Sequence, residues 1–170
     1  TIYEGEWTNG EKFSGPFMDT PGKPKYVPSM NGQGKLTVLD GSIYVGSFKE
    51  GSFTGQGVIT AADGITSGNF YGGSLASGTK EFINGDVYVG EFDGKAGTID
   101  LTYRTFNLSG EGTLTYANGD VFTGLFNLDI PRKGRFAYAN GDLYTGEVTG
   151  KLRSQRGVRT ILTIPDGHGT

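Results

Sequence analysis

The chain has 170 residues, of which 35% are hydrophobic and 19% charged, a composition typical of a folded protein rather than a disordered one. Its formal net charge of −3 argues against nucleic acid as a partner, and its lack of cysteine excludes disulfides and thiolate metal sites. No apolar stretch approaches the roughly 20 residues of a membrane helix, and residues 1–30 carry no signal-peptide pattern.

The first predicted element is a strand around residues 3–7, where Tyr3, Gly5 and Trp7 alternate with acidic residues. Residues 16–30 follow, with four of the six prolines, and are predicted to form a long loop. From residue 34 onward the chain repeats a unit of about 22 residues, which we interpret as a strand, a tight turn, a second strand and a connection. Each turn is predicted at a pair that strongly favours hairpins: Asp40-Gly41, Asp63-Gly64, Asn84-Gly85, Asn118-Gly119 and Asn140-Gly141.

The strand after each turn has the pattern aromatic-x-Gly-x-aromatic, as in Tyr44-Gly46-Phe48, with weaker copies at 66–70 and 144–148. Residues 93–111 are predicted to be a second insert, in which Thr98–Phe106 could form an additional strand. No segment keeps an apolar period of 3.6 residues, so no helix is expected.

The register of two hairpins can also be predicted, because alternation places Tyr44, Gly46 and Phe48 on one face. A three-residue loop at 40–42 would pair Leu36 with Gly46 and Gly34 with Phe48, and a two-residue loop at 63–64 would pair Ile59 with Gly68. A glycine opposite an aromatic residue lets the ring lie across bare backbone. We therefore expect four glycines to pack under rings: Gly46, Gly90, Gly124 and Gly146.

The pattern Tyr-x-Gly-x-Phe/Trp, followed by glycines and then Gly-x-Leu-x-x-x-Asp-Gly, resembles the MORN repeat (membrane occupation and recognition nexus) from Tyr3 to Gly167. The resemblance implies an all-β fold over residues 1–170: an elongated, twisted, single-layer antiparallel sheet of consecutive hairpins with aromatic residues on one concave face. The array begins in the second strand of a hairpin and stops after a turn pair, so we expect a fragment of a longer protein. Members of the family include scaffolds, adaptors and segments of larger enzymes.

The aromatic face is interpreted first as the core of a thin sheet, and second as a groove for a helix or extended peptide of a partner. The candidate groove residues are Trp7, Tyr44, Phe48, Tyr88, Phe92, Phe122, Phe126 and Tyr144. Tyr138 belongs to the same face.

A second candidate is the basic C-terminal third, because residues 131–160 hold seven basic and two acidic residues in an otherwise acidic chain. Such a surface could bind phosphoinositide headgroups or an acidic partner, but we favour the simpler interpretation of a solvated strand face, with the acidic end attracting the next module. The candidate anionic-partner residues are Arg132, Lys133, Arg135, Lys151, Arg153, Arg156 and Arg159.

The chain contains few of the side chains that usually carry out catalysis. His168 is the only histidine, and with no cysteine the metal-assisted, Cys-His and Ser-His mechanisms lack their usual groups. We expect no catalytic residues, no metal and no cofactor.

The leading hypothesis is a non-catalytic scaffold or protein-binding module. The alternatives are an anionic-lipid-binding module and a targeting segment of an enzyme whose catalytic domain lies in a longer protein. A protein partner is expected first and an anionic membrane surface second, with no nucleic acid. A cytoplasmic or membrane-peripheral location is favoured over a bacterial surface.

Overall fold

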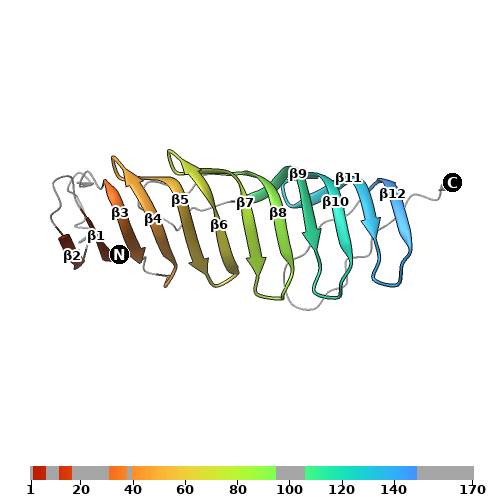
Figure 1. The fold of residues 1–170 in the computed structure, drawn as a ribbon, viewed down its shortest axis with the longest axis horizontal. Coiled ribbons are helices and arrows are strands. Elements are labelled where there is room, and N and C mark those ends of the chain that lie inside the picture. The colour runs from red at the N-terminus through yellow and green to blue at the C-terminus, as the bar shows by residue number, and fades with distance from the viewer. Residues whose placement is uncertain (1, 7–11, 17–30, 38–39, 95–105, 149–170) are drawn as a thin grey trace.

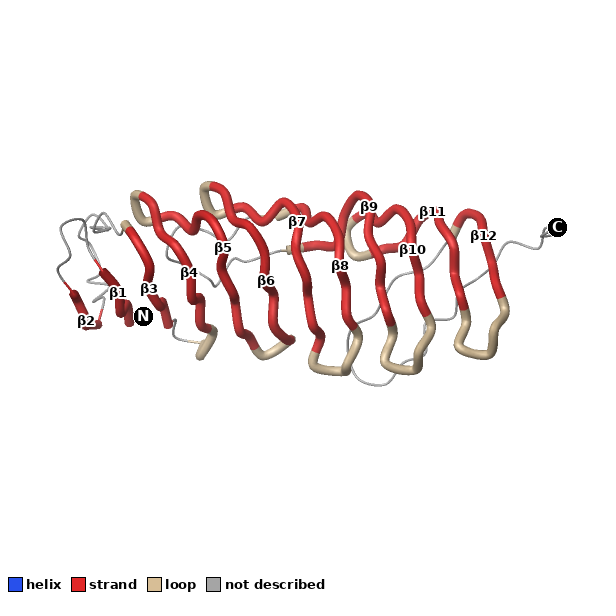
Figure 2. Tube along the Cα trace, viewed as in Figure 1, coloured by secondary structure: helices blue, strands red, loops and turns tan. Residues whose placement is uncertain are grey.

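The computed structural model describes residues 2–6, 12–16, 31–37, 40–94 and 106–148, and of the first two ranges only the backbone. These residues form one antiparallel sheet of 12 strands in the order β12-β11-β10-β9-β8-β7-β6-β5-β4-β3-β1-β2. The sheet is a single elongated layer that twists along its length (Figure 1, Figure 2). No helix occurs among the described residues, and the predicted all-β array of hairpins is confirmed.

Consecutive strands from β3 to β12 pair in chain order and make five hairpins, whose turns lie along one long edge of the sheet (Figure 1). The strands are β1 (Ile2–Glu6), β2 (Lys12–Pro16), β3 (Gly32–Thr37), β4 (Ile43–Lys49), β5 (Ser52–Ala61), β6 (Gly64–Tyr71), β7 (Ser74–Phe82), β8 (Val87–Asp93), β9 (Asn107–Thr115), β10 (Val121–Asn127), β11 (Ile130–Ala137) and β12 (Leu143–Glu147).

The N-terminal edge departs from the regular order. β1 lies between β3 and β2, so β2 is the outermost strand at this end of the sheet. The sequence of β2, Lys-Phe-Ser-Gly-Pro, falls outside the repeat pattern and was not predicted as a strand. Its Pro16 belongs to the strand rather than to the predicted loop at 16–30, and residues 17–30 lie outside the described residues.

The predicted register of the first two complete hairpins was wrong by two residues. Leu36 pairs with Tyr44 rather than with Gly46, and the last described pair before the turn is Thr37 with Ile43. Ile59 pairs with Thr66, and the turn of that hairpin is 62–63 rather than 63–64. A shift of two residues preserves the face of every side chain, so the predicted aromatic face is unaffected. Only the cross-strand partners differ.

The register is set by glycine pairing with glycine. An unbroken row of glycines crosses 11 of the 12 strands at right angles to the chain direction, each paired with the glycine of the next strand. The row consists of Gly5, Gly34, Gly46, Gly57, Gly68, Gly78, Gly90, Gly112, Gly124, Gly134 and Gly146.

Aromatic rings lie over this glycine row, but each ring comes from the same strand as one of its glycines, two residues earlier. A Cβ built on Gly57 would stand 2.6 Å from Cε2 of Tyr44, and one on Gly90 would stand 2.6 Å from Cζ of Tyr88. The prediction that glycines pack under rings is confirmed for Gly46, Gly90 and Gly146. For Gly124 the nearest atoms to a Cβ would be the Gly134 Cα, at 2.6 Å, and the Lys133 carbonyl oxygen, while the ring of Phe122 lies 2.8 Å from a Cβ built on its partner Gly134.

Two rows of large apolar side chains flank the glycine row on the same face and form the core. The row nearer the hairpin turns, here the lower row, runs from Leu36 and Tyr44 to Phe122 and Phe136. The row on the other side, the upper row, contains Phe48, Phe53, Phe70, Leu75, Phe92, Leu108, Phe126 and Val148, all buried.

The two rows pack onto each other across the glycines. The ring of Tyr44 stacks on Phe53 with centroids 3.8 Å apart, and Tyr88 meets Phe126 edge to face at 5.0 Å. Without side chains at the glycine row, the rings of one row reach those of the other. A single-layer sheet thus builds a core between two halves of its own strands.

The second insert is described only at its ends. Residues 95–105, which hold most of the predicted strand Thr98–Phe106, lie outside the described residues. Phe106 itself precedes β9 and is buried, with its ring 6.0 Å from that of Phe70.

Candidate functional site

Most of the predicted groove residues lie inside the core. Among those described, all are buried except Tyr144, which is half-buried, as is Tyr138; Trp7 lies outside the described side chains. A partner could reach these rings only by separating the upper and lower rows. The groove function therefore stays a prediction, and the exposed apolar side chains lie on the other face of the sheet. The buried groove residues are Tyr44, Phe48, Tyr88, Phe92, Phe122 and Phe126.

The tyrosine hydroxyls of the lower row are tied to backbone carbonyls. The hydroxyl of Tyr88 donates to the Glu91 carbonyl at 2.8 Å and lies 3.2 Å from that of Ser109, and Tyr44 donates to the Ser47 carbonyl at 3.0 Å. Burial, and secondarily the charge of Glu91, raises the pKa of Tyr88 to about 12. Burial also raises the pKa of Tyr44. These hydroxyls thus remain neutral and serve packing rather than proton transfer.

The lower row has one polar interruption. Lys80 occupies an apolar position of the repeat, beside the buried Thr66. Its Nζ lies 2.8 Å from Oδ2 of Asp63 and 4.9 Å from the centroid of the Phe82 ring. Both contacts satisfy the ammonium group at the rim of the core, so the departure from the repeat pattern needs no external ligand to explain it.

The opposite face of the sheet carries the exposed apolar side chains. Val45 and Val58 pair across β4 and β5 and are 50% and 40% exposed, and Val89 on β8 is 53% exposed. They belong to a row, here the outer row, that crosses the sheet beside the glycines. The outer row from β4 to β10 consists of Val45, Val58, Ser67, Thr79, Val89, Thr113 and Thr123.

The outer row has no charged residue from β4 to β10, and every member is β-branched or carries a hydroxyl. The sequence held a signal for it that was missed. The position between the aromatic residue and the glycine is Val45, Val89, Thr123 and Thr145 in the four copies that begin with an aromatic residue.

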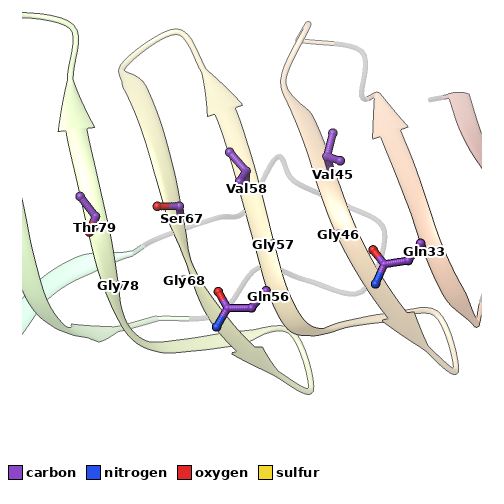
Figure 3. A pocket seen from close by; sticks show the side chains of 10 residues that line it. All are labelled: Gln33, Val45, Gly46, Gln56, Gly57, Val58, Ser67, Gly68, Gly78 and Thr79. Atoms are coloured by element: carbon purple, nitrogen blue, oxygen red, sulfur yellow. The ribbon is translucent and has the colours of Figure 1, made fainter.

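A shallow depression of about 440 Å³ follows the outer row across β4 to β7. Its floor is the backbone of Gly46, Gly57, Gly68 and Gly78. Figure 3 shows Val45, Val58, Ser67 and Thr79 along one side of this floor and Gln33 and Gln56 along the other. The depression joins exposed methyl groups to neutral amides and hydroxyls, a chemistry that suits binding more than catalysis.

The basic candidate surface is described only in part. Arg132, Lys133 and Arg135 lie exposed on β11, and none of them forms an ion pair within the described part of the chain. Lys133 and Arg135 are two residues apart and share one face of the sheet. The other four predicted residues, Lys151, Arg153, Arg156 and Arg159, lie outside the described residues.

Over the described ranges, no three His, Cys, Asp or Glu side chains come together in a way that could hold a metal ion. Nor does any helix in those ranges have the length and apolarity needed to cross a membrane.

Comparison with known protein families identifies a repeat in this chain. The family model of the MORN repeat matches residues 3–12, 44–66 and 107–121. Among the described residues, these segments include most of β1 and β4 and all of β5 and β9. No curated protein matches the chain.

Proposed function

Because the chain is a MORN-repeat protein, and such repeats generally serve as protein- or membrane-binding modules, we propose that it is a non-catalytic scaffold that binds a protein partner. The partner is proposed to dock on the outer row rather than on the aromatic face. The observation that carries this proposal is the difference in exposure between the two faces of the sheet. Most of the aromatic rings are buried in the core, whereas the side chains of Val45, Val58 and Val89 remain exposed.

The composition of the outer row supports a protein partner. The centre of a protein interface is depleted of charge, and exposed apolar patches on soluble proteins commonly mark interaction sites. Ile65 adds to the patch, since it lies on the same face as Ser67 and is 41% exposed. The flanking Gln33 and Gln56 can donate and accept hydrogen bonds at the rim of the depression.

The geometry favours a partner segment that runs along the depression, across the strands. The backbone groups of internal strands are already paired in the sheet, so strand addition at this place is excluded. A segment with small apolar anchors, as in an amphipathic helix, fits a shallow groove between two rows of side chains.

The test is a double substitution, Val58→Glu with Val89→Glu. Substitutions of exposed residues usually change stability within about 0.5 kcal/mol, so the fold should survive, as circular dichroism and a thermal melt would verify. Affinity capture from the native cell extract should lose the partner that the wild type retains. Ile83→Glu is the matched control, because Ile83 is 83% exposed but lies in the turn between β7 and β8. Identical captured proteins for all three baits would refute docking on the outer row.

A second candidate is binding to an anionic membrane surface. The observation that favours it is the exposure of Arg132, Lys133 and Arg135 on β11, in a chain whose C-terminal sequence is also rich in arginine. Basic clusters are attracted to anionic lipid by about 1 kcal/mol per residue.

A further inference from the structure

The outward-facing residues of the last six described strands, β7 to β12, form a regular surface, here called the C-terminal patch (Figure 1). In each of these strands a glycine of the glycine row is flanked by two outward-facing residues, and a third lies two positions nearer the hairpin turn. The patch comprises the outward-facing side chains of residues 77–81, 87–91, 111–115, 121–125, 133–137 and 143–147.

Acidic and basic residues are sorted across this patch. Glu91 on β8 and Glu111 on β9 are exposed acids. A Cβ built on Gly110 would collide with the Glu91 carboxylate, so this side chain lies over β9 beside the second acid. Lys133 and Arg135 are exposed bases on β11. One strand, β10, therefore separates the acidic side of the patch from its basic side.

The rest of the patch is mainly apolar or bears hydroxyl groups. Val89, Leu125 and Leu143 are 53%, 42% and 63% exposed. Thr113 and Thr123 pair across β9 and β10, with their Oγ1 atoms 3.2 Å apart. Exposed apolar side chains gathered on one surface commonly mark an interaction site.

The order of the charges on this patch is self-complementary. A twofold axis can lie between two copies of the sheet, parallel to the strands and level with the gap between β9 and β10. It sets β8 of each copy against β11 of the other, and β9 against β10. Glu91 of each copy then faces Lys133 of the other, with Arg135 two residues away on the same face. Since a twofold contact is isologous, each acid–base pair forms twice.

The same rotation keeps the remaining acids away from like charges. It sets β7 of one copy against β12 of the other. Glu81 then faces Leu143. Glu147 faces Ser77. An axis level with β10 itself would instead set Glu91 against Glu147, so the charges select the position of the axis.

The arrangement agrees with the way in which sheets pack. Two sheets in face-to-face contact keep their strands aligned to within about 30°, and an axis parallel to the strands aligns them. With about 4.8 Å between strands and about 3.4 Å per residue, a patch six strands wide and five residues long covers about 500 Å² per copy. The pair thus buries about 1,000 Å², the size at which specific protein interfaces begin.

We propose that the C-terminal patch is the interface of a homodimer, in which two copies of this chain pack outer face to outer face. The inference goes beyond the docking of a different protein, and it can be tested without one. Most of the floor of the depression, Gly46, Gly57 and Gly68, lies on β4 to β6, which β7 to β12 of the second copy do not reach. The dimer therefore carries two depressions, one toward each of its ends.

The test is a charge-swap experiment on the full chain, measured by sedimentation equilibrium from micromolar to millimolar concentration. One variant carries Glu91→Lys with Glu111→Lys, and the other carries Lys133→Glu with Arg135→Glu. Each variant alone should dimerise at least about tenfold more weakly than the wild type, because like charges then face each other. An equimolar mixture of the two should form a heterodimer at least as strong as the wild-type dimer.

Lys49→Glu is the control, because Lys49 is exposed on β4 outside the patch, and it should leave the equilibrium unchanged. Circular dichroism verifies the fold of each variant, which exposed substitutions usually preserve. Added salt should weaken the wild-type dimer, a measurement that needs no variant. The proposal is overturned by a wild type that stays monomeric or whose dimer ignores salt. It is equally overturned by a mixture that associates no better than its components, or by a dimer that only one variant weakens.

Discussion

Gly90→Ala should destabilise the sheet strongly, although it adds a single methyl group. The new Cβ would lie 2.6 Å from both Cζ of Tyr88 and the Cα of Gly112, so neither the ring nor the neighbouring strand can stay in place. Overpacking of this kind costs about 1–3 kcal/mol, and displacement of the Tyr88 hydroxyl from the Glu91 carbonyl adds about 1 kcal/mol. We expect a loss of about 3 kcal/mol, which lowers the melting temperature of a chain of this size by roughly 6–12 °C.

Denaturant titration and a thermal melt measure this loss, and a double-mutant cycle assigns its cause. Tyr88→Leu removes the ring atoms that the methyl group would strike, so the double variant should lose at least about 1 kcal/mol less than the sum of the single variants. Tyr88→Phe separates the hydrogen-bond contribution from the packing. An unchanged melting temperature for Gly90→Ala, or strictly additive effects, would refute the view that the ring needs bare backbone beneath it.

Two further predictions concern pH and lipid. Since the folded pKa of Tyr88 is about 12, above the 10.0 of an exposed tyrosine, the unfolded chain ionises first. Stability should therefore be unaffected below pH 10 and fall as the pH rises toward 12, with a late tyrosinate signal in a spectrophotometric titration; a single titration step at the ordinary value would contradict this. If the basic C-terminal third binds anionic lipid, the protein should sediment with phosphoinositide liposomes at low salt, and added salt should abolish this binding. Replacing Arg153, Arg156 and Arg159 with serine should also abolish it without loss of the fold. Wild-type protein that ignores such liposomes would end the lipid hypothesis.

The sequence was sufficient to predict the hairpins, because turn pairs and strand alternation are local signals. It was insufficient for their register, because the pairing of Gly34 with Gly46 depends on packing that involves more than the two strands of one hairpin. The Tyr44 ring needs two adjacent glycines, Gly46 and Gly57, to lie flat across β4 and β5. A single hairpin considered alone cannot reveal that requirement.

The same limit applies to the candidate site. The aromatic residues were interpreted as core first, and their burial agrees with that interpretation, yet the groove residues were still chosen from them. Whether a ring is open or covered depends on how the upper row packs across the glycine row onto the lower row, which brings Phe53 onto Tyr44. The outer row could have been read from alternation alone, since its residues lie between the aromatic and glycine positions.

Because each strand pairs only with its neighbours, the length of the array is proportional to the number of its hairpins. Strands in a sheet are spaced by about 4.8 Å, so every two-stranded hairpin lengthens the array by about 9.6 Å and repeats the same surface. Gain or loss of one hairpin by recombination would change the distance between the two ends of the array by the length of one hairpin. The register of the glycine row would be kept, because it is defined anew at each pair of strands. Span can therefore evolve in fixed steps, independently of the chemistry of the binding face.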